Sequence, residues 1–241
     1  MKLEITKTGS KVGFTLIELS IVMAIIGLIV AGIISGRQLV RQGQLLAMTR
    51  DIQRYQTAWR LFKSQYEAFP GDMANADSYW SGATNGNGNS DVDQADNDNP
   101  HEGYYAWQHL ALSGLIPGTY TPTGPLSSYN HPKAAIEGNF FGINGKGSSG
   151  ANRPYVHTLD IPTYMSAYPY ADWNTPGLNA LDTQAIDNKI DDGNAYFGNT
   201  VGSDAATISA GYCSTASTSY NITQAIATPQ IKACWVQIRL D

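Results

Sequence analysis

The sequence predicts an α+β protein in which a long N-terminal helix precedes a globular head. Residues 14–36 form an apolar run of 23 residues, and apolar side chains recur at heptad spacing from Leu45 to Phe69. The rest of the chain is rich in Gly, Asn, Ser, Thr and Tyr and ends in an alternating apolar segment at 231–240. These patterns predict one continuous helix followed by short helices, strands and loops.

Composition excludes several classes of protein. The 241 residues include 15 basic and 20 acidic side chains, for a formal net charge of −5. An acidic chain lacks the basic patch that a general nucleic-acid binder needs. The mean hydropathy is slightly negative, which excludes a polytopic membrane protein. Two cysteines are too few for a cysteine zinc cluster.

The apolar run is long enough to span a bilayer, which requires about 20 residues. Lys2, Lys7 and Lys11 precede it, as in an export signal. A removable signal fits poorly, because its apolar part is only about 7–15 residues long and ends at small residues. A plain membrane anchor leaves Glu18 unexplained, since a carboxylate at mid-bilayer costs about 2.5–3.5 kcal/mol.

The helix is predicted to continue from the apolar run to about Tyr66, for a length of about 80 Å at ~1.5 Å per residue. Phe69-Pro70-Gly71 ends it. A heptad pattern is typical of a coiled coil, but aromatic side chains dominate this one, so packing against the protein's own sheet is favoured. The heptad positions are Leu45, Met48, Ile52, Tyr55, Trp59, Phe62, Tyr66 and Phe69.

Within the head, helices are predicted at 101–114 and at 180–192, the second with Gly193 as its C-cap. The last segment is predicted to be a strand with one apolar face, while Trp235, Gln237 and Arg239 point the other way. The apolar face consists of Cys234, Val236, Ile238 and Leu240.

No catalytic motif is recognisable, so we expect neither an enzyme nor a resident cofactor. The four histidines form no H-E-x-x-H, and no G-x-S-x-G occurs. Residues 145–150 match G-x-G-x-x-G, but Pro154 follows where that fingerprint requires a helix.

The start of the apolar run resembles the N-terminal signature of a known protein family. The segment Gly13-Phe14-Thr15-Leu16-Ile17-Glu18-Leu19 resembles the N-terminal signature of type IV prepilins and of type II secretion pseudopilins. The resemblance implies that a prepilin peptidase in the membrane cuts after Gly13 and methylates Phe14. It also implies that Glu18 of one subunit neutralises the Phe14 amine of the next, and that the fold is a ladle whose head contains an antiparallel β-sheet.

The resemblance also implies a division of the chain and a location. Residues 1–13 are the cytoplasmic leader, 14–36 the transmembrane and filament-core half of the helix, 37–66 its amphipathic half and 67–241 the head. The prepilin lies in the inner membrane with its head in the periplasm, and then enters a periplasmic or extracellular filament. Its partners are the peptidase, other pilin subunits and the inner-membrane assembly platform.

Three functions are open at this stage. A type IV pilus subunit, major or minor, is favoured by the large, loop-rich head. The first alternative is a pseudopilin of a type II secretion system. The second, from a different class, is a periplasmic binding protein that keeps an uncleaved membrane anchor.

A disulfide is predicted between Cys213 and Cys234, because an exported head meets an oxidising compartment where two cysteines are usually bridged. Many pilins have a disulfide-bounded C-terminal region of this kind.

An acidic loop follows the helix and contains partial calcium-ligand spacing at Asn87, Asn89, Asp91 and Asp98. Val92 replaces the glycine of the complete calcium motif and Asp98 its glutamate. A solvated loop is therefore the favoured interpretation, with calcium binding as the alternative.

Overall fold

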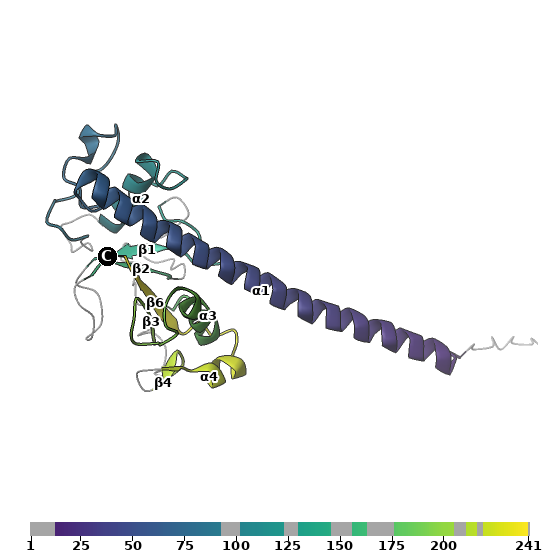
Figure 1. Ribbon diagram of the computed structural model, residues 1–241. Coiled ribbons are helices and arrows are strands. Elements are labelled where there is room, and N and C mark those ends of the chain that lie inside the picture. Colours follow the sequence, from purple (N-terminus) through teal and green to yellow (C-terminus); the bar gives the residue numbers. More distant parts are fainter. Residues whose placement is uncertain are drawn as a thin grey trace, which may run out of the picture. The chain divides into compact units, whose positions relative to one another are not determined.

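The computed structural model describes residues 13–92, 102–122, 130–145, 156–162, 176–204, 211–215 and 219–240. It confirms the α+β class, with a long N-terminal helix and an antiparallel sheet in the C-terminal part (Figure 1). Two compact units divide after Gly43, within the first helix. The second unit, residues 44–241, therefore includes the last turns of that helix.

Helix α1 runs from Leu16 to Tyr66, close to the predicted bounds. In the first unit, every residue from 13 to 35 is exposed, including all the large apolar ones. This helix is the one in the described part of the chain that is long and apolar enough to cross a membrane. It could therefore anchor the protein in a lipid bilayer.

In the second unit, α1 supplies much of the hydrophobic core. The Tyr55 ring packs edge-on against Trp107 and Phe141, at centroid distances of 5.0 and 5.1 Å. Such contacts stabilise beyond the area they bury. The heptad stripe thus packs within the protein's own head, but not against the sheet alone as was predicted: Trp107 belongs to the helix Glu102–Leu112, and Phe141 precedes the strand Gly142–Asn144. The buried stripe residues are Leu45, Met48, Ile52, Tyr55, Trp59, Phe62 and Phe69.

Polar side chains of α1 also bond the end of the chain. Gln56 Nε2 donates to the carbonyl of Arg239 at 2.8 Å, and Arg60 Nε donates to that of Leu240 at 3.3 Å. These bonds join positions about 180 residues apart in sequence. The helix and the last strand are therefore fixed to one another inside the second unit.

The main sheet has four antiparallel strands in the order β1-β2-β6-β3 (Figure 1). Strand β6 lies between β2 and β3, with Ile238 opposite both Leu159 and Thr200. The strands are β1 (Gly142–Asn144), β2 (Thr158–Asp160), β3 (Thr200–Asp204) and β6 (Cys234–Arg239). Strands β4 (Ser214–Thr215) and β5 (Ser219–Tyr220) form a separate pair.

The predicted alternation of the last strand is largely confirmed. Its apolar face is fully buried, and Trp235 and Arg239 on the other face are half-buried. Gln237 differs from expectation because it is buried as well.

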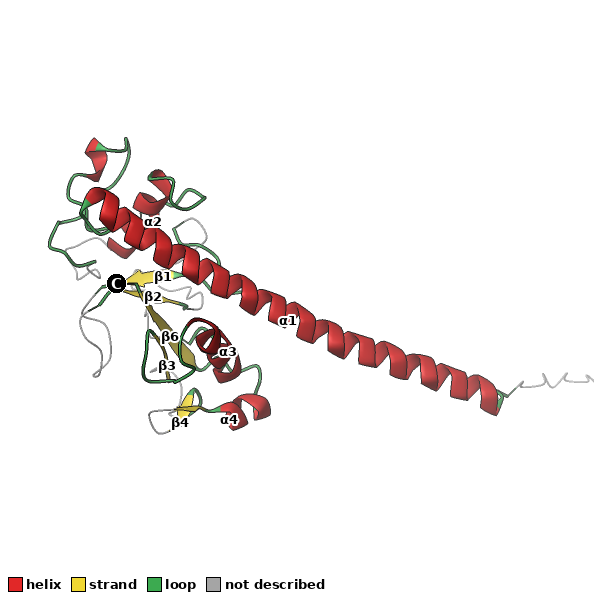
Figure 2. Cartoon of the chain, in the orientation of Figure 1, coloured by secondary structure: helices red, strands yellow, loops and turns green. Residues whose placement is uncertain are grey.

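The remaining helices are η1 (Ala76–Ser78), α2 (Glu102–Leu112), α3 (Ala180–Ile190) and α4 (Ile222–Ala227). Figure 2 shows them among long loops, as the glycine- and asparagine-rich composition predicts. The predicted end of α3 was wrong. Asp191, not Gly193, is the C-cap, because its N–H donates to the Asp187 carbonyl and its carboxylate accepts the N–H of Thr200, the first residue of β3.

Candidate functional site

The N-terminal segment is the first candidate site. Gly13 and Phe14 precede α1 and are exposed, and a Cβ placed on Gly13 would touch nothing within 4 Å. Local packing therefore does not require glycine at this position. A requirement for a small residue would have to come from another molecule, such as the expected peptidase.

Thr15 and Glu18 form a capping box at the first turn of α1. The Glu18 carboxylate accepts the Thr15 N–H at 2.8 Å and the Thr15 hydroxyl at 2.6 Å. In return, the Glu18 N–H donates to Thr15 Oγ1 at 3.3 Å. This pair was not among the predicted features, although T-x-x-E ahead of an apolar run is its known signature. Glu18 therefore has an intramolecular partner in the single chain.

The predicted disulfide between Cys213 and Cys234 is present, with a Cα–Cα distance of 4.9 Å. Both cysteines are fully buried. Cys234 is the first residue of β6 and pairs with Asp204 of β3. The bridge therefore attaches the central strand of the sheet to the segment that leads into β4.

The predicted calcium-ligand residues lie in a loop whose backbone is tightly bonded. Asn87 N–H donates to Glu102 Oε1 at 2.8 Å, and Ser90 N–H donates to Asp72 Oδ2 at 3.0 Å. Both accepting carboxylates are buried. The described part of the loop is therefore attached to the core through its backbone, while residues 87–90 are exposed to solvent, as expected for a solvated loop.

Within this loop the Asn87 and Asn89 side chains each accept the backbone N–H two residues on, at 2.9 and 2.8 Å. The left-handed residues of this loop are Gly88, with φ of 74°, and Ser90, with φ of 69°. Val92, which stands at the glycine position of the calcium motif, does not have a positive φ. Asp98 lies outside the described residues, so calcium binding here stays a prediction.

A buried histidine that was not singled out as a site links two loops. His109 Nδ1 accepts the Gly71 N–H at 2.9 Å, and its Nε2 lies 2.7 Å from the Thr84 carbonyl. These partners require the neutral tautomer with hydrogen on Nε2. Burial lowers the pKa of His109 below 6.5, although the bond to Thr84 opposes the shift.

Comparisons with protein-family models, with curated proteins and with solved structures found no match for this chain.

Proposed function

We propose that the chain is a structural subunit of a type IV pilus-like filament, inserted into the inner membrane as a prepilin and assembled through its N-terminal helix. The observation that carries this proposal is the position of the Gly13–Glu18 segment. It leads into α1 and includes the first residues of this helix, of which residues 16–35 are all exposed.

The exposed apolar surface needs a partner. Monomeric soluble proteins rarely leave contiguous apolar patches above a few hundred Å² uncovered. Lipid covers this surface in the membrane, and the apolar helices of neighbouring subunits replace lipid in a filament. The same residues then serve both states without refolding.

The charges at the helix start favour ordered stacking over random aggregation. Cleavage after Gly13 would create an α-amino group on Phe14, with a pKa near 7.7–8.0 in model peptides. A Glu18 carboxylate of the adjacent subunit can neutralise this amine in the apolar filament core. A subunit placed out of register would leave both charges buried and unpaired, which is strongly unfavourable.

The head is compatible with an exported location. Its buried disulfide suits an oxidising compartment such as the periplasm. The large head and its disulfide-bounded C-terminal region favour a pilus subunit over a secretion pseudopilin. The proposed partners are the prepilin peptidase, further pilin subunits and the inner-membrane assembly platform.

Intact-mass analysis of protein purified from its native cells tests the proposal. A pilin-like subunit should lack residues 1–13 and carry one added methyl group. An unprocessed mass in cells with an active prepilin peptidase would instead support the membrane-anchored binding protein. Sheared surface fractions then distinguish a pilus, whose subunits are released outside the cell, from a periplasmic pseudopilus.

A further inference from the structure

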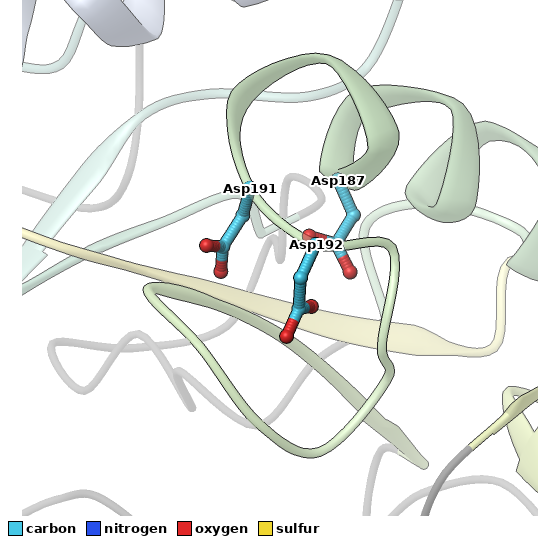
Figure 3. Close-up of side chains that lie close together, drawn as sticks. All are labelled: Asp187, Asp191 and Asp192. Carbon is cyan, nitrogen blue, oxygen red and sulfur yellow. The ribbon is translucent and has the colours of Figure 1, made fainter.

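Three carboxylates gather at the C-terminal end of α3. Asp187 lies in the last turn of the helix, and Asp191 and Asp192 follow it directly. One oxygen from each side chain lies within 4.8 Å of those of the other two (Figure 3). No ion pair within the described residues includes any of the three. The cluster therefore holds concentrated negative charge that basic side chains in the described part of the chain do not neutralise.

Hydrogen bonds hold each carboxylate in place. Asp187 Oδ2 accepts the Tyr220 hydroxyl at 2.9 Å, and Asp192 Oδ1 accepts the Asn194 N–H at 2.8 Å. Asp191 Oδ2 accepts two backbone N–H groups, those of Asn199 and Thr200. In each carboxylate, these bonds use one of the two oxygens. The positions of the ligand groups are thus set without any bound ion.

The second oxygen of Asp187 has no hydrogen bond, and this independently indicates a missing ligand. Asp187 is fully buried, and its Oδ1 has no hydrogen-bond partner. The nearby Gly193 N–H does not reach hydrogen-bond geometry with this oxygen. Burial raises the pKa of Asp187 to about 6, even though the Tyr220 hydroxyl bond lowers it. Native proteins rarely leave such an oxygen unsatisfied, because the desolvation penalty is not recovered.

The helix end adds to the negative potential. The C-terminus of a helix carries partial negative charge, so it favours cations and disfavours carboxylates. Three aspartates within six residues of sequence oppose this preference. A bound cation would offset both the mutual repulsion of the carboxylates and their unfavourable interaction with the helix.

We propose that Asp187, Asp191 and Asp192 form a binding site for a calcium ion. The donors are all carboxylate oxygens, which suit hard cations. Calcium–oxygen distances of about 2.3–2.6 Å place opposite ligands about 4.6–5.2 Å apart, which accommodates the observed spacing. Magnesium suits the site less well, because it demands near-ideal octahedral geometry and releases its water reluctantly, whereas calcium accepts irregular sets of carboxylates.

The ion would stabilise the C-terminal part of the head. Asp191 already connects the end of α3 to Thr200, the first residue of β3. Strand β3 pairs with β6, which carries the disulfide. Calcium would therefore hold α3 against the sheet at a point far in sequence from the 87–91 loop. The inference does not depend on the proposed filament function.

The test uses the full-length protein in detergent, freed of divalent ions and titrated with calcium chloride. We expect heat of binding in calorimetry and a rise in melting temperature with calcium, because the ion binds only the folded state. Asp192→Asn should weaken calcium affinity at least tenfold, since it removes an exposed ligand without disturbing the core. The matched control is Asp77→Asn, which makes the same change at another exposed aspartate and should leave binding unchanged.

A second variant, Asp91→Asn, separates this site from the 87–91 loop. If Asp192→Asn binds one calcium ion fewer per chain than wild type, the proposal is supported, regardless of the result for Asp91→Asn. Wild-type protein that neither binds millimolar calcium nor gains thermal stability would overturn it. So would calcium binding that Asp91→Asn abolishes and Asp192→Asn leaves intact.

Discussion

Thr15 and Glu18 are bonded to each other three times across the first turn of α1, through both backbone N–H groups and the threonine hydroxyl. In the single chain, Glu18 therefore caps its own helix. Assembly by the proposed mechanism requires this carboxylate to face the amine of a neighbouring Phe14 as well. A carboxylate has two oxygens and about four acceptor sites, and here Oε2 accepts both bonds from Thr15. The two roles are compatible.

The first prediction separates the two roles of Glu18. Glu18→Val should still insert into the membrane and be cleaved, because the segment becomes more apolar. It should enter filaments poorly, because Phe14 loses its partner charge. Thr15→Val is the matched control: it removes the capping hydroxyl, at a cost of about 1 kcal/mol in helix stability, but keeps the carboxylate. Co-expression with wild-type subunits and quantification in sheared filaments measures both. Equal incorporation of Glu18→Val and wild type would rule out the assembly role.

The second prediction concerns Gly13. Its surroundings in the structure leave room for a side chain, so Gly13→Leu should fold normally. We expect this variant to remain full length in the membrane, because the peptidase needs access to the Gly13 carbonyl. Ser10→Leu introduces the same side chain three residues earlier and should be processed. Immunoblotting of membrane fractions distinguishes the two forms, and normal cleavage of Gly13→Leu would refute the assigned cut.

The third prediction concerns the disulfide. Replacing Cys213 and Cys234 together with alanine should lower the free energy of unfolding by about 3 kcal/mol, as the chain-entropy model suggests for a loop of this size. Urea unfolding of the detergent-solubilised protein measures the loss. Wild-type protein unfolded in the presence of reductant is the control and should show a similar decrease. An unchanged midpoint in the double variant would mean that the bridge does not stabilise the folded head.

The fourth prediction is a pH dependence caused by His109. In the unfolded chain, the pKa of His109 is about 6.5. In the folded chain its pKa is lower, because burial and the bond from the Gly71 N–H favour the neutral ring. The contribution of His109 to stability is therefore complete above pH 6.5 and is lost as the pH falls through and below that value. The slope is at most about 1.4 kcal/mol per pH unit for one proton.

Comparison with His109→Gln isolates this effect. The difference in unfolding free energy between wild type and variant should be constant at pH 7.5–8.5 and shrink as the pH is lowered from 6.5 to 5. Carboxylates that titrate in the same range are present in both proteins and cancel in the difference. Parallel stability curves over the whole range would show that His109 is not responsible.

Local features of the head were predictable to within a few residues. Helices were expected at 101–114 and 180–192 and are found at Glu102–Leu112 and Ala180–Ile190. The end of α3 was misplaced because Asp191 leaves the helix to bond the backbone at Thr200, nine residues on. Helical sequence patterns relate residues three or four positions apart. A competing hydrogen bond between residues nine positions apart therefore leaves no periodic signal in the sequence.

The sequence by itself determined the parts of this protein that depend on nearest neighbours along the chain or on simple counting. The exposed apolar helix follows from 23 residues with one charge, and the disulfide partners follow from there being two cysteines. Only the tertiary structure decided the strand order, the pairing of β6 with both β2 and β3, and the burial of His109 between two loops. It alone revealed that Asp187 is buried beside Asp191 and Asp192 with an unsatisfied oxygen. The physical reason is that burial and strand pairing depend on contacts between segments far apart in sequence, and many residues together determine which of those segments meet.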